Sequence, residues 1–237
     1  MLSLIYISFL CTWSSSTAFA RAAAQPNLLK SLGSTTDSKR QLLQTSCKVT
    51  SKDIEGPFYK RNAPIQQITP ALVPQVCKNN VANDRLILNG TIRQISDGNP
   101  CGKPTRAVLD VWQANADGEY SDHSALSTDF ACRTRLVTNH DGIFTFSSIF
   151  PGRYDDGGFR PAHIHFQITP LDLNDRAIGK TLTTQMYFAQ DHFLKPHDSC
   201  AMCSSDDPTL ITHVSHQTDI KTFVGTWDVL LSSDDAN

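Results

Sequence analysis

Apolar and polar residues alternate with a period of two along several short stretches of the chain. These stretches are residues 85–93, 107–113, 135–138, 143–150, 162–169, 181–188 and 223–231. Side chains along a β-strand point alternately to the two faces of a sheet, so each stretch predicts a strand with one face toward a core. Short strands separated by turns rich in Gly, Pro, Asn and Asp predict an all-β protein, an antiparallel β-sandwich.

Two kinds of segment interrupt the predicted strands. Turn-forming residues gather at 96–100, 115–119 and 139–142. Residues 189–219 form a much longer segment without a regular pattern, and long loops of this kind are usually functional or mobile. A Cys200-x-x-Cys203 pair inside this segment offers one way of holding it together.

The two ends of the chain differ from its middle. Residues 2–13 are apolar but too few to cross a bilayer comfortably, and small residues ending in Ala18-Phe19-Ala20 follow them. This pattern predicts a secretory signal peptide over residues 1–20, cut after Ala20 or Ala24, with an uncleaved anchor or a buried strand as the alternative. Residues 21–46 are expected to be a flexible leader, 47–231 the β-sandwich domain and 232–237 a polar tail.

Charge and cysteine content narrow the classes of function. The formal net charge of the 237 residues is −2, which gives no reason to expect nucleic acid as a partner, or a membrane once the signal is removed. Seven cysteines become six when Cys11 leaves with the signal. An even set agrees with export and with about three disulfides, but six cysteines allow fifteen pairings and the sequence does not choose among them.

Two histidines, His163 and His165, stand two residues apart on the stretch 162–169. They point to one face of the predicted strand, whereas Ile164 and Phe166 point toward the core. Two imidazoles on one face form the start of a metal site. Zinc usually adds Cys, Asp or Glu ligands, and copper in electron-transfer sites adds Cys or Met. Tyrosines nearby favour ferric iron instead, because a trivalent cation holds a phenol in its deprotonated form.

The residues around these histidines form five motifs. They are Glu55-Gly-Pro-Phe-Tyr59, Asp110-Val-Trp-Gln-Ala-Asn-Ala-Asp-Gly-Glu-Tyr120, Asp141-Gly-Ile-Phe-Thr-Phe-Ser-Ser-Ile-Phe-Pro-Gly-Arg-Tyr154, Arg160-Pro-Ala-His-Ile-His-Phe166 and Thr184-Gln-Met-Tyr-Phe188. In their order and spacing the chain resembles the intradiol ring-cleavage dioxygenases, the non-haem ferric family that includes catechol 1,2-dioxygenase and protocatechuate 3,4-dioxygenase. The resemblance covers most of the domain and implies that family's β-sandwich with long irregular loops.

The resemblance also implies the ligands of a single, non-haem Fe(III) ion. They would be Tyr120, Tyr154, His163 and His165. A catechol would reach the metal after losing both hydroxyl protons, one of them to Tyr154 as this ligand departs, while Tyr120 stays. Ring cleavage with O2 would then give a cis,cis-muconate.

The resemblance assigns further residues to the substrate. Arg160 would face the bound catecholate and Gln185 would lie beside it, both as parts of the catalytic machinery. The substrate pocket would be bordered by Ile54, Pro57 and Tyr59. The loop at 155–159 is shorter than in the best-known enzymes, so the pocket is expected to differ there.

The implied partners are a small aromatic diol and O2. The best-known catechol-cleaving relatives carry a helical amino-terminal region used for dimerisation, and here only a short polar leader precedes Glu55, so a monomer is expected. A secreted enzyme of this kind would meet plant or environmental phenolics outside the cell, and detoxification is one role that this suggests.

Four other interpretations stay open at this point. The tyrosines and histidines could be ordinary turn and strand residues. The chain could also be a secreted β-sandwich that binds a metal or a phenol without turnover. A zinc or copper hydrolase or oxidase could use His163 and His165, although no third ligand is obvious in that stretch. Finally, His197-x-x-Cys200-x-x-Cys203, with His213 and His216 downstream, has zinc-like spacing, against which a disulfide is the better interpretation in a secreted chain.

Overall fold

A computed structural model of the chain describes residues 47–67, 73–78, 84–96, 98–155 and 157–233. The chain divides into two units, Met1–Thr45 and Ser46–Asn237, and the fold below is that of the second unit. The expected signal peptide and leader lie outside the described residues, as does the end of the expected polar tail. Within the described part of the chain, no helix has the length and apolar character needed to span a membrane.

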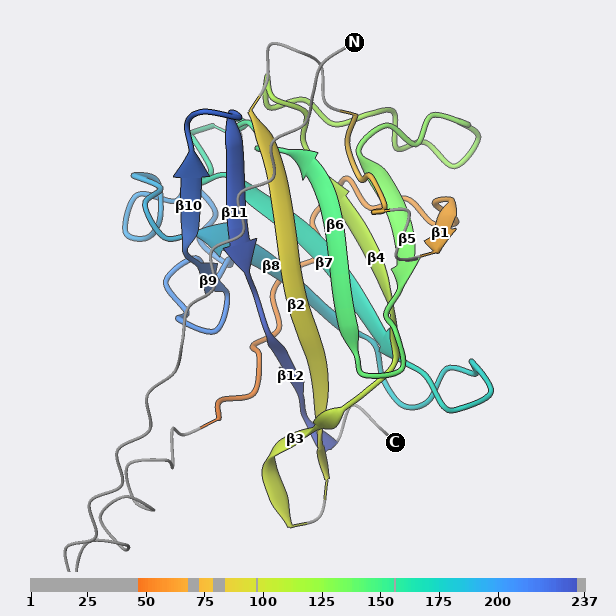
Figure 1. The fold of residues 1–237 in the computed structure, drawn as a ribbon. Helices are drawn as coiled ribbons and strands as arrows, with labels where there is room; N and C mark the ends of the chain where they lie inside the picture. The colour runs from red at the N-terminus through yellow and green to blue at the C-terminus, as the bar shows by residue number, and fades with distance from the viewer. Residues whose placement is uncertain (1–46, 68–72, 79–83, 97, 156, 234–237) are drawn as a thin grey trace, which may run out of the picture. The chain divides into compact units, whose positions relative to one another are not determined.

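Twelve strands in the described residues form two sheets that face each other (Figure 1). The first sheet has the order β1 (Ile65–Gln67), β5 (Arg133–Val137), β4 (Ala107–Gln113), β7 (His163–Pro170), β8 (Leu182–Phe188) and β9 (Ile211–Thr212). The second contains β10 (Val214–Gln217), β11 (Thr222–Thr226), β2 (Arg85–Ser96) and β12 (Val229–Leu231), with β3 (Asn99–Pro104) and β6 (Ile143–Ile149) also paired to β2. The predicted all-β sandwich is thus confirmed.

The two sheets are mixed rather than purely antiparallel. The main pairs β4–β5, β4–β7, β7–β8 and β2–β6 are antiparallel, as expected. Four pairs of described strands are parallel: β1–β5, β8–β9, β11–β2 and β12–β2. Parallel partners need a long crossover connection, and such long-range pairing leaves no mark in the local alternation of residues.

The core fills the space between the sheets. From the first sheet it receives the apolar face of β7, and Phe166 contacts both Phe146 of β6 and Trp227, with ring centroids 6.2 and 4.8 Å apart. From the second sheet it receives alternate residues of β2, including the fully buried Leu86 and Leu88. Aromatic contacts of this kind stabilise a core beyond the area that they bury.

The alternation located the main strands. The stretch 107–113 matches β4 residue for residue, and four more stretches match β2, β6, β7 and β8 to within a few residues. The strands β1 and β3 were not predicted, because one is three residues long and the other contains Asn, Pro and Gly, which indicate turns. Residues 189–219, expected to be irregular throughout, contain β9 and β10.

The predicted strand at 223–231 is in fact two strands, β11 and β12. The chain leaves the ladder between them: the Trp227 amide donates to the Asn89 carbonyl at 2.9 Å, and Asp228 Oδ1 accepts the Thr91 amide at 2.9 Å. Gly90 lies at this break, and a Cβ there would come within 2.0 Å of the Trp227 carbonyl oxygen. The interruption therefore depends on a close backbone approach that an alternation pattern does not reveal.

Three disulfides join the six cysteines of the described residues. They are Cys47–Cys101, Cys77–Cys132 and Cys200–Cys203. The expectation of three bonds is confirmed, and the structure selects one of the fifteen pairings.

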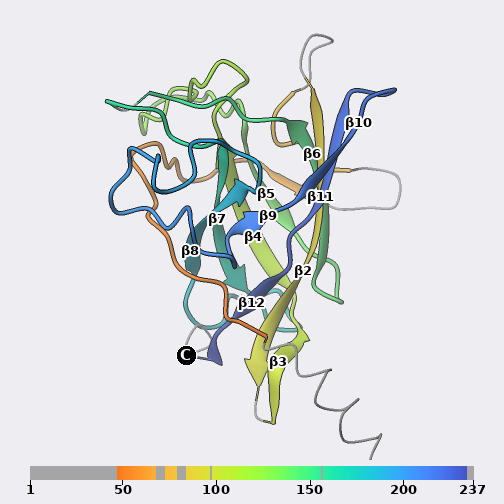
Figure 2. The same cartoon turned by 90° about the vertical axis from the view of Figure 1, so that its left-hand side faces the viewer.

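The irregular segments that surround the predicted site residues lie on the side of the first sheet that faces away from the second sheet. Figure 2 shows the two sheets as separate layers, with the loops beyond β7 and β8. These loops cover the face of β7 that does not enter the core, and they form the site described next.

Candidate metal centre and active site

Strand register places the first group of site residues. His165 of β7 pairs with Trp112 of β4 on one side and with Gln185 of β8 on the other, and His163 pairs with Tyr187 of β8. Directly opposed residues of paired strands share a face of the sheet. All five side chains therefore lie together on the face away from the core, and all five are at most 2% exposed.

Two loops bring the predicted tyrosines to this face. Tyr120 follows the turn at 115–119 and Tyr154 follows β6, and the two loops meet backbone to backbone, with the Gly152 amide donating to the Asn115 carbonyl at 2.8 Å. A Cβ on Gly118 would come within 2.2 Å of the Arg153 carbonyl oxygen, and one on Gly152 within 2.4 Å of the Ala116 carbonyl oxygen. Glycine at these two positions is what allows the tyrosines to approach each other.

The four predicted metal ligands converge. The Tyr120 hydroxyl oxygen lies 3.3 Å from Nε2 of His163 and 3.2 Å from Nε2 of His165. The ring of Tyr154 lies edge-on to Tyr120 with centroids 5.6 Å apart, and 5.7 Å from the ring of His163. Tyr120 has one phenolic proton to share with two imidazole nitrogens, so a cation bound among these atoms would satisfy lone pairs that this proton cannot.

The two imidazoles are held in different ways. Nδ1 of His163 lies 2.6 Å from the Pro161 carbonyl oxygen, which can only accept, so Nδ1 carries the proton and Nε2 presents a lone pair to Tyr120. His165 stacks on Trp112 with centroids 4.8 Å apart, and its buried Nδ1 has no partner among the described residues. A Cβ on Gly56 would lie 3.3 Å from His165 Cε1, so the segment at 54–59 also borders this ring. Fixed ring orientation is typical of metal-binding histidines.

Burial decides the charge state of these groups. Burial, with the charge of Arg160 second, lowers the pKa of His163 to about 3. Burial and the neighbouring His163 likewise hold the pKa of His165 well below its ordinary value. Both imidazoles are therefore neutral at physiological pH, which is the form that binds a metal. Burial and Tyr154 raise the pKa of Tyr120, so this phenol needs a nearby cation to lose its proton.

The donor set fits ferric iron better than zinc. Among the residues that the structure describes, no group of three or more His, Cys, Asp and Glu side chains is arranged to hold a metal ion. The cluster consists instead of two neutral imidazoles and two phenols, and phenolate is a hard anionic donor suited to a trivalent cation. His163, His165, Tyr120 and Tyr154 would hold that ion.

Arg160 is the centre of a polar network beside the cluster. Its Nη1 donates to the Tyr154 hydroxyl at 3.3 Å, and its Nη2 donates to Gln185 Oε1 and the Tyr187 hydroxyl, both at 3.2 Å. Its Nε donates to Asp198 Oδ1 at 3.0 Å. Burial alone would lower the pKa of Arg160, but the contacts, of which the hydrogen bond to Asp198 is the largest, raise it above its ordinary value. The guanidinium is permanently charged and directed toward Tyr154.

The predicted pocket segment 54–59 packs over the site. The Ile54 carbonyl accepts a hydrogen bond from Nε2 of the Gln185 side chain at 2.9 Å, and Pro57 is exposed. The Tyr59 hydroxyl donates to Asp110 at 3.2 Å and its ring contacts Trp112, the residue that stacks on His165. Burial, followed by Asp110, raises the pKa of Tyr59 to about 12. The border of the substrate pocket that was predicted from Ile54, Pro57 and Tyr59 stays a prediction.

Several site residues were not predicted. Phe58 stacks on Tyr120 with centroids 4.3 Å apart, and Tyr187 donates to Asp53 Oδ2 at 2.8 Å. Tyr187 stands two residues after Gln185 on one strand, so period-two alternation places it on the same face and could have found it. Asp53 and Asp198 reach the network from irregular segments, where no local pattern indicates which side chains turn inward.

The zinc-like constellation does not form a site. Cys200 and Cys203 are bonded to each other, so neither provides a thiolate. His197 stacks on His192 with centroids 5.2 Å apart. The disulfide interpretation of this pattern is confirmed.

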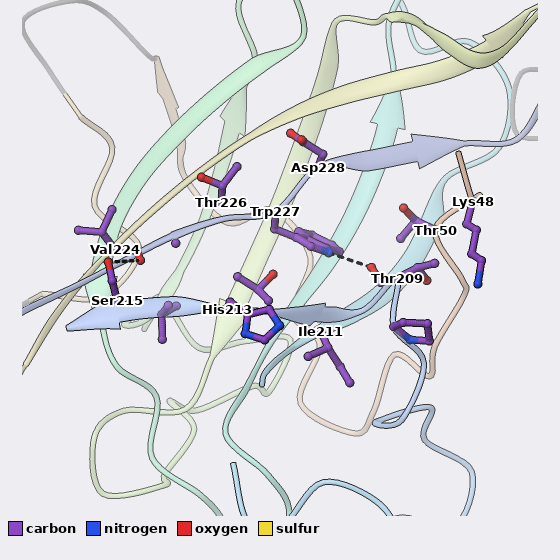
Figure 3. Close-up of a pocket in the computed structure, with 14 residues that line it drawn as sticks. Lys48, Thr50, Thr209, Ile211, His213, Ser215, Val224, Thr226, Trp227 and Asp228 are labelled. Atoms are coloured by element: carbon purple, nitrogen blue, oxygen red, sulfur yellow. Dashed lines mark hydrogen bonds between the residues drawn. The ribbon is translucent and has the colours of Figure 1, made fainter. Parts of the chain in front are cut away.

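A cavity of about 680 Å³ lies elsewhere, beside β9, β10 and β11 (Figure 3). Figure 3 shows Trp227 among the lining side chains, with the indole N–H donating to the Thr209 carbonyl at 3.1 Å. Because this ring is 3% exposed and its N–H is paired, it offers no free face for a ligand to stack on. None of the predicted site residues lines the cavity.

Comparison with known proteins agrees with the site. The chain matches the family model described as Dioxygenase over residues 54–233. It is 36% identical over 175 residues to a chlorocatechol 1,2-dioxygenase of Rhodococcus opacus, a match that covers 66% of this chain and 63% of that protein. It is 38% identical over 132 residues to the protocatechuate 3,4-dioxygenase beta chain of Burkholderia cepacia, covering 49% of this chain and 52% of that protein.

The fold is also found in solved structures. The dioxygenase domain of a dioxygenase carbohydrate-binding protein fusion from Streptomyces sp. SirexAA-E matches with a TM-score of 0.59 at 28% identity, covering 78% of this chain and 99% of that chain. The chain spans between half and two thirds of the length of the two relatives named above. Since the family model matches most of the chain and the motif residues meet in one site, the chain belongs to the intradiol ring-cleavage dioxygenase family.

Proposed function

We propose that this chain is a mononuclear, non-haem Fe(III) dioxygenase that cleaves catechol-type aromatic diols with O2 to products of the cis,cis-muconate type. One observation carries the proposal: two neutral imidazoles and two phenols lie in one cluster, with the Tyr120 oxygen within 3.3 Å of both Nε2 atoms and the Tyr154 ring 5.6 and 5.7 Å from the rings of Tyr120 and His163. A protein that only bound a metal or a phenol would not need a charged arginine aimed at one of the ligands.

Each ligand has a distinct task in this proposal. His163 and His165 supply two neutral nitrogens, and their orientation is fixed by the Pro161 carbonyl and by the Trp112 ring. Tyr120 supplies a lasting anionic oxygen. When bound, ferric iron supplies Lewis acidity that favours the doubly deprotonated diol and prepares its ring for reaction with O2.

Tyr154 is the proposed acceptor of a substrate proton. Its hydroxyl has fewer partners than that of Tyr120: it accepts a hydrogen bond from Arg160 Nη1, whereas the Tyr120 oxygen lies within 3.3 Å of two imidazole nitrogens. A guanidinium at 3.3 Å stabilises a phenolate oxygen, and it remains to contact the substrate once that oxygen takes a proton and turns away. Tyr154 takes one of the two protons that the diol loses, and a hydroxide ion would take the other. The two negative charges of the diol then replace the two that Tyr154 and the hydroxide lose, so no uncompensated charge is buried.

Arg160 and Phe58 orient the substrate and limit water in this proposal. Arg160 is 2% exposed and offers Nη1 to negative charge that develops on the ring and the attacking oxygen. Phe58 packs on both tyrosines, face to face with Tyr120 and edge-on to Tyr154 with centroids 5.6 Å apart. An aromatic wall beside the ligands favours a flat, apolar ring over other diols.

We also propose that the enzyme is secreted and acts on phenolics outside the cell. The six cysteines of the described residues all form disulfides, which agrees with an oxidising compartment, and residues 1–20 have the composition of a signal peptide. Sequencing the amino terminus of protein recovered from the culture medium tests this. A start at Arg21 or Gln25 supports the proposal, and retention of the uncut chain inside the cells contradicts it.

The visible spectrum of the protein tests the metal and the substrate together. Loaded with ferric iron, the protein should show a broad tyrosinate-to-iron band that shifts when catechol is added without O2. Admission of O2 should then consume catechol and produce a muconate, followed by its ultraviolet absorption. A protein that stays colourless after iron loading would contradict the proposed function. A band that shifts without any product would favour a binding protein without turnover.

Replacing His165 should remove the metal. We expect His165→Gln to lower the iron content of the purified protein at least about tenfold, because a ligand is lost from a small donor set. His197→Gln is the matched control, since His197 belongs to the zinc-like pattern whose cysteines are disulfide-bonded. Metal analysis of both variants decides: iron retained in His165→Gln, or lost in His197→Gln, would place the metal elsewhere.

Replacing Tyr154 should separate metal binding from chemistry. Tyr154→Phe keeps the ring and its contact with Phe58 but removes the oxygen that accepts the proton. We expect iron to be retained while kcat falls on the order of 100-fold or more, as for the loss of a general base. Stopped-flow absorbance should show catechol deprotonation as the slowed step. Turnover equal to that of the unmodified protein would remove Tyr154 from the mechanism.

A further inference from the structure

Arg160 is held along one edge by a carboxylate from the long segment after β8. Asp198 accepts from Nε at 3.0 Å through Oδ1 and from Nη2 at 3.5 Å through Oδ2. The two side chains are 3% and 0% exposed, so the pair is buried. Asp198 thus occupies the Nε and Nη2 edge of the guanidinium. Nη1 lies outside that edge and donates to the Tyr154 hydroxyl at 3.3 Å. A planar, side-on grip of this kind fixes the direction of a guanidinium as well as its charge.

Asp198 is itself held by a small covalent ring. The Cys200 amide donates to Asp198 Oδ1 at 2.9 Å, and Cys200 is bonded to Cys203. The Cys203 amide donates back to the Cys200 carbonyl at 3.3 Å. The backbone that orients the carboxylate therefore lies in a four-residue turn that the disulfide closes.

The far end of this turn reaches the same network. The amide of Ser204, next to Cys203, donates to Asp53 Oδ2 at 3.1 Å, and Tyr187 donates to the same oxygen at 2.8 Å. The Tyr187 hydroxyl in turn accepts from Arg160 Nη2 at 3.2 Å. The segment 198–204 thus contacts Arg160 directly at one end and through Asp53 and Tyr187 at the other.

We propose that Asp198 is a positioning residue that aims the Arg160 guanidinium at the substrate, and that the Cys200–Cys203 disulfide keeps it in place. This inference rests on the proposed function. The long segment after β8 carries none of the predicted ligands. In this inference it contributes to the reaction by orienting the Arg160 guanidinium. Its tests therefore measure quantities that the loss of a purely structural residue would leave unchanged.

The first test is a double-mutant cycle between Asp198 and Arg160. Asp198→Asn removes the charge but keeps the shape and one acceptor. We expect it to leave iron content unchanged and to lower kcat/KM for catechol about 10- to 100-fold, since a small misplacement of a catalytic group has effects of this size. In an Arg160→Lys background the same change should alter kcat/KM by less than about threefold, because lysine lacks the planar guanidinium that Asp198 orients.

An exposed ion pair of the same kind provides the control. Asp175 accepts from Arg106 Nε at 2.6 Å, with its side chain 59% exposed. Asp175→Asn should leave both kcat/KM and iron content unchanged, since surface pairs contribute little. The affinity for catechol without O2, followed by the visible band, gives a readout independent of turnover, and it should weaken in Asp198→Asn alone.

The second test compares two disulfides. Cys200 and Cys203 are 3 residues apart in the sequence, whereas Cys47 and Cys101 are 54 residues apart. A cross-link restrains the unfolded chain more when its loop is longer. Replacing Cys200 and Cys203 by Ser should lower kcat/KM about tenfold with a small change in Tm, as expected for lost positioning. Replacing Cys47 and Cys101 by Ser should lower Tm clearly and leave kcat/KM within about twofold, as expected for lost cross-linking.

The outcomes separate this inference from the proposed function. An unmodified protein that neither binds iron nor cleaves catechol overturns both. An active unmodified protein with unchanged kcat/KM in Asp198→Asn, or with an equal loss in the Arg160→Lys background, overturns the positioning role alone. If Asp198→Asn does not fold, the Cys200→Ser and Cys203→Ser protein carries the test, and unchanged catechol affinity and kcat/KM in that protein overturn the inference.

Discussion

The two-residue alternation of β7 is the constraint on which the core and the site both depend. Ile164 and Phe166 enter the core between the sheets, and His163 and His165 lie on the opposite face. A shift of one residue in the pairing of this strand would exchange the two sets, burying imidazoles in the core and bringing apolar side chains to the metal cluster. The contact of Phe166 with Trp227 across the sandwich therefore does more than stabilise the fold, because it selects the register that forms the site.

The polar side of that strand is stable because its buried groups nearly all have partners. Arg160 is the clearest case: four side chains accept its hydrogen bonds, among them the buried carboxylate of Asp198. A buried arginine without such partners would cost several kcal/mol. Among the described residues of this face, Nδ1 of His165 and Nε1 of Trp112 have no hydrogen-bond partner, and stacking of these two rings takes over the orientation that a hydrogen bond provides for His163. Ring stacking and hydrogen bonding thus each fix the orientation of one of the two imidazoles.

How far the sequence could predict this structure depends on whether a feature is local. The central strands follow from alternation, and the predicted metal ligands meet because the motifs that contain them carry the required glycines, such as Gly118 and Gly152. Short edge strands and the break near Trp227 depend on partners far away in the sequence, so no local pattern indicates them. Asp198 is a stronger example. Nothing near it distinguishes it from any other aspartate in a polar loop, and only the folded chain shows that its carboxylate is buried against Arg160.

The disulfides explain how such loops can hold site residues at all. Irregular segments lack the ladder of hydrogen bonds that orders a strand, and three of them cover this site. Two of them lie next to a cross-link: the excursion that carries Tyr120 ends at Cys132, and Asp198 precedes Cys200. The sheets place the imidazoles, and covalent closure limits the freedom of the loops that bring the phenols and carboxylates to them. This division makes the geometry of the site dependent on oxidised cysteines, so it agrees with the proposed secretion and would be lost in a reducing compartment before the sheets themselves unfold.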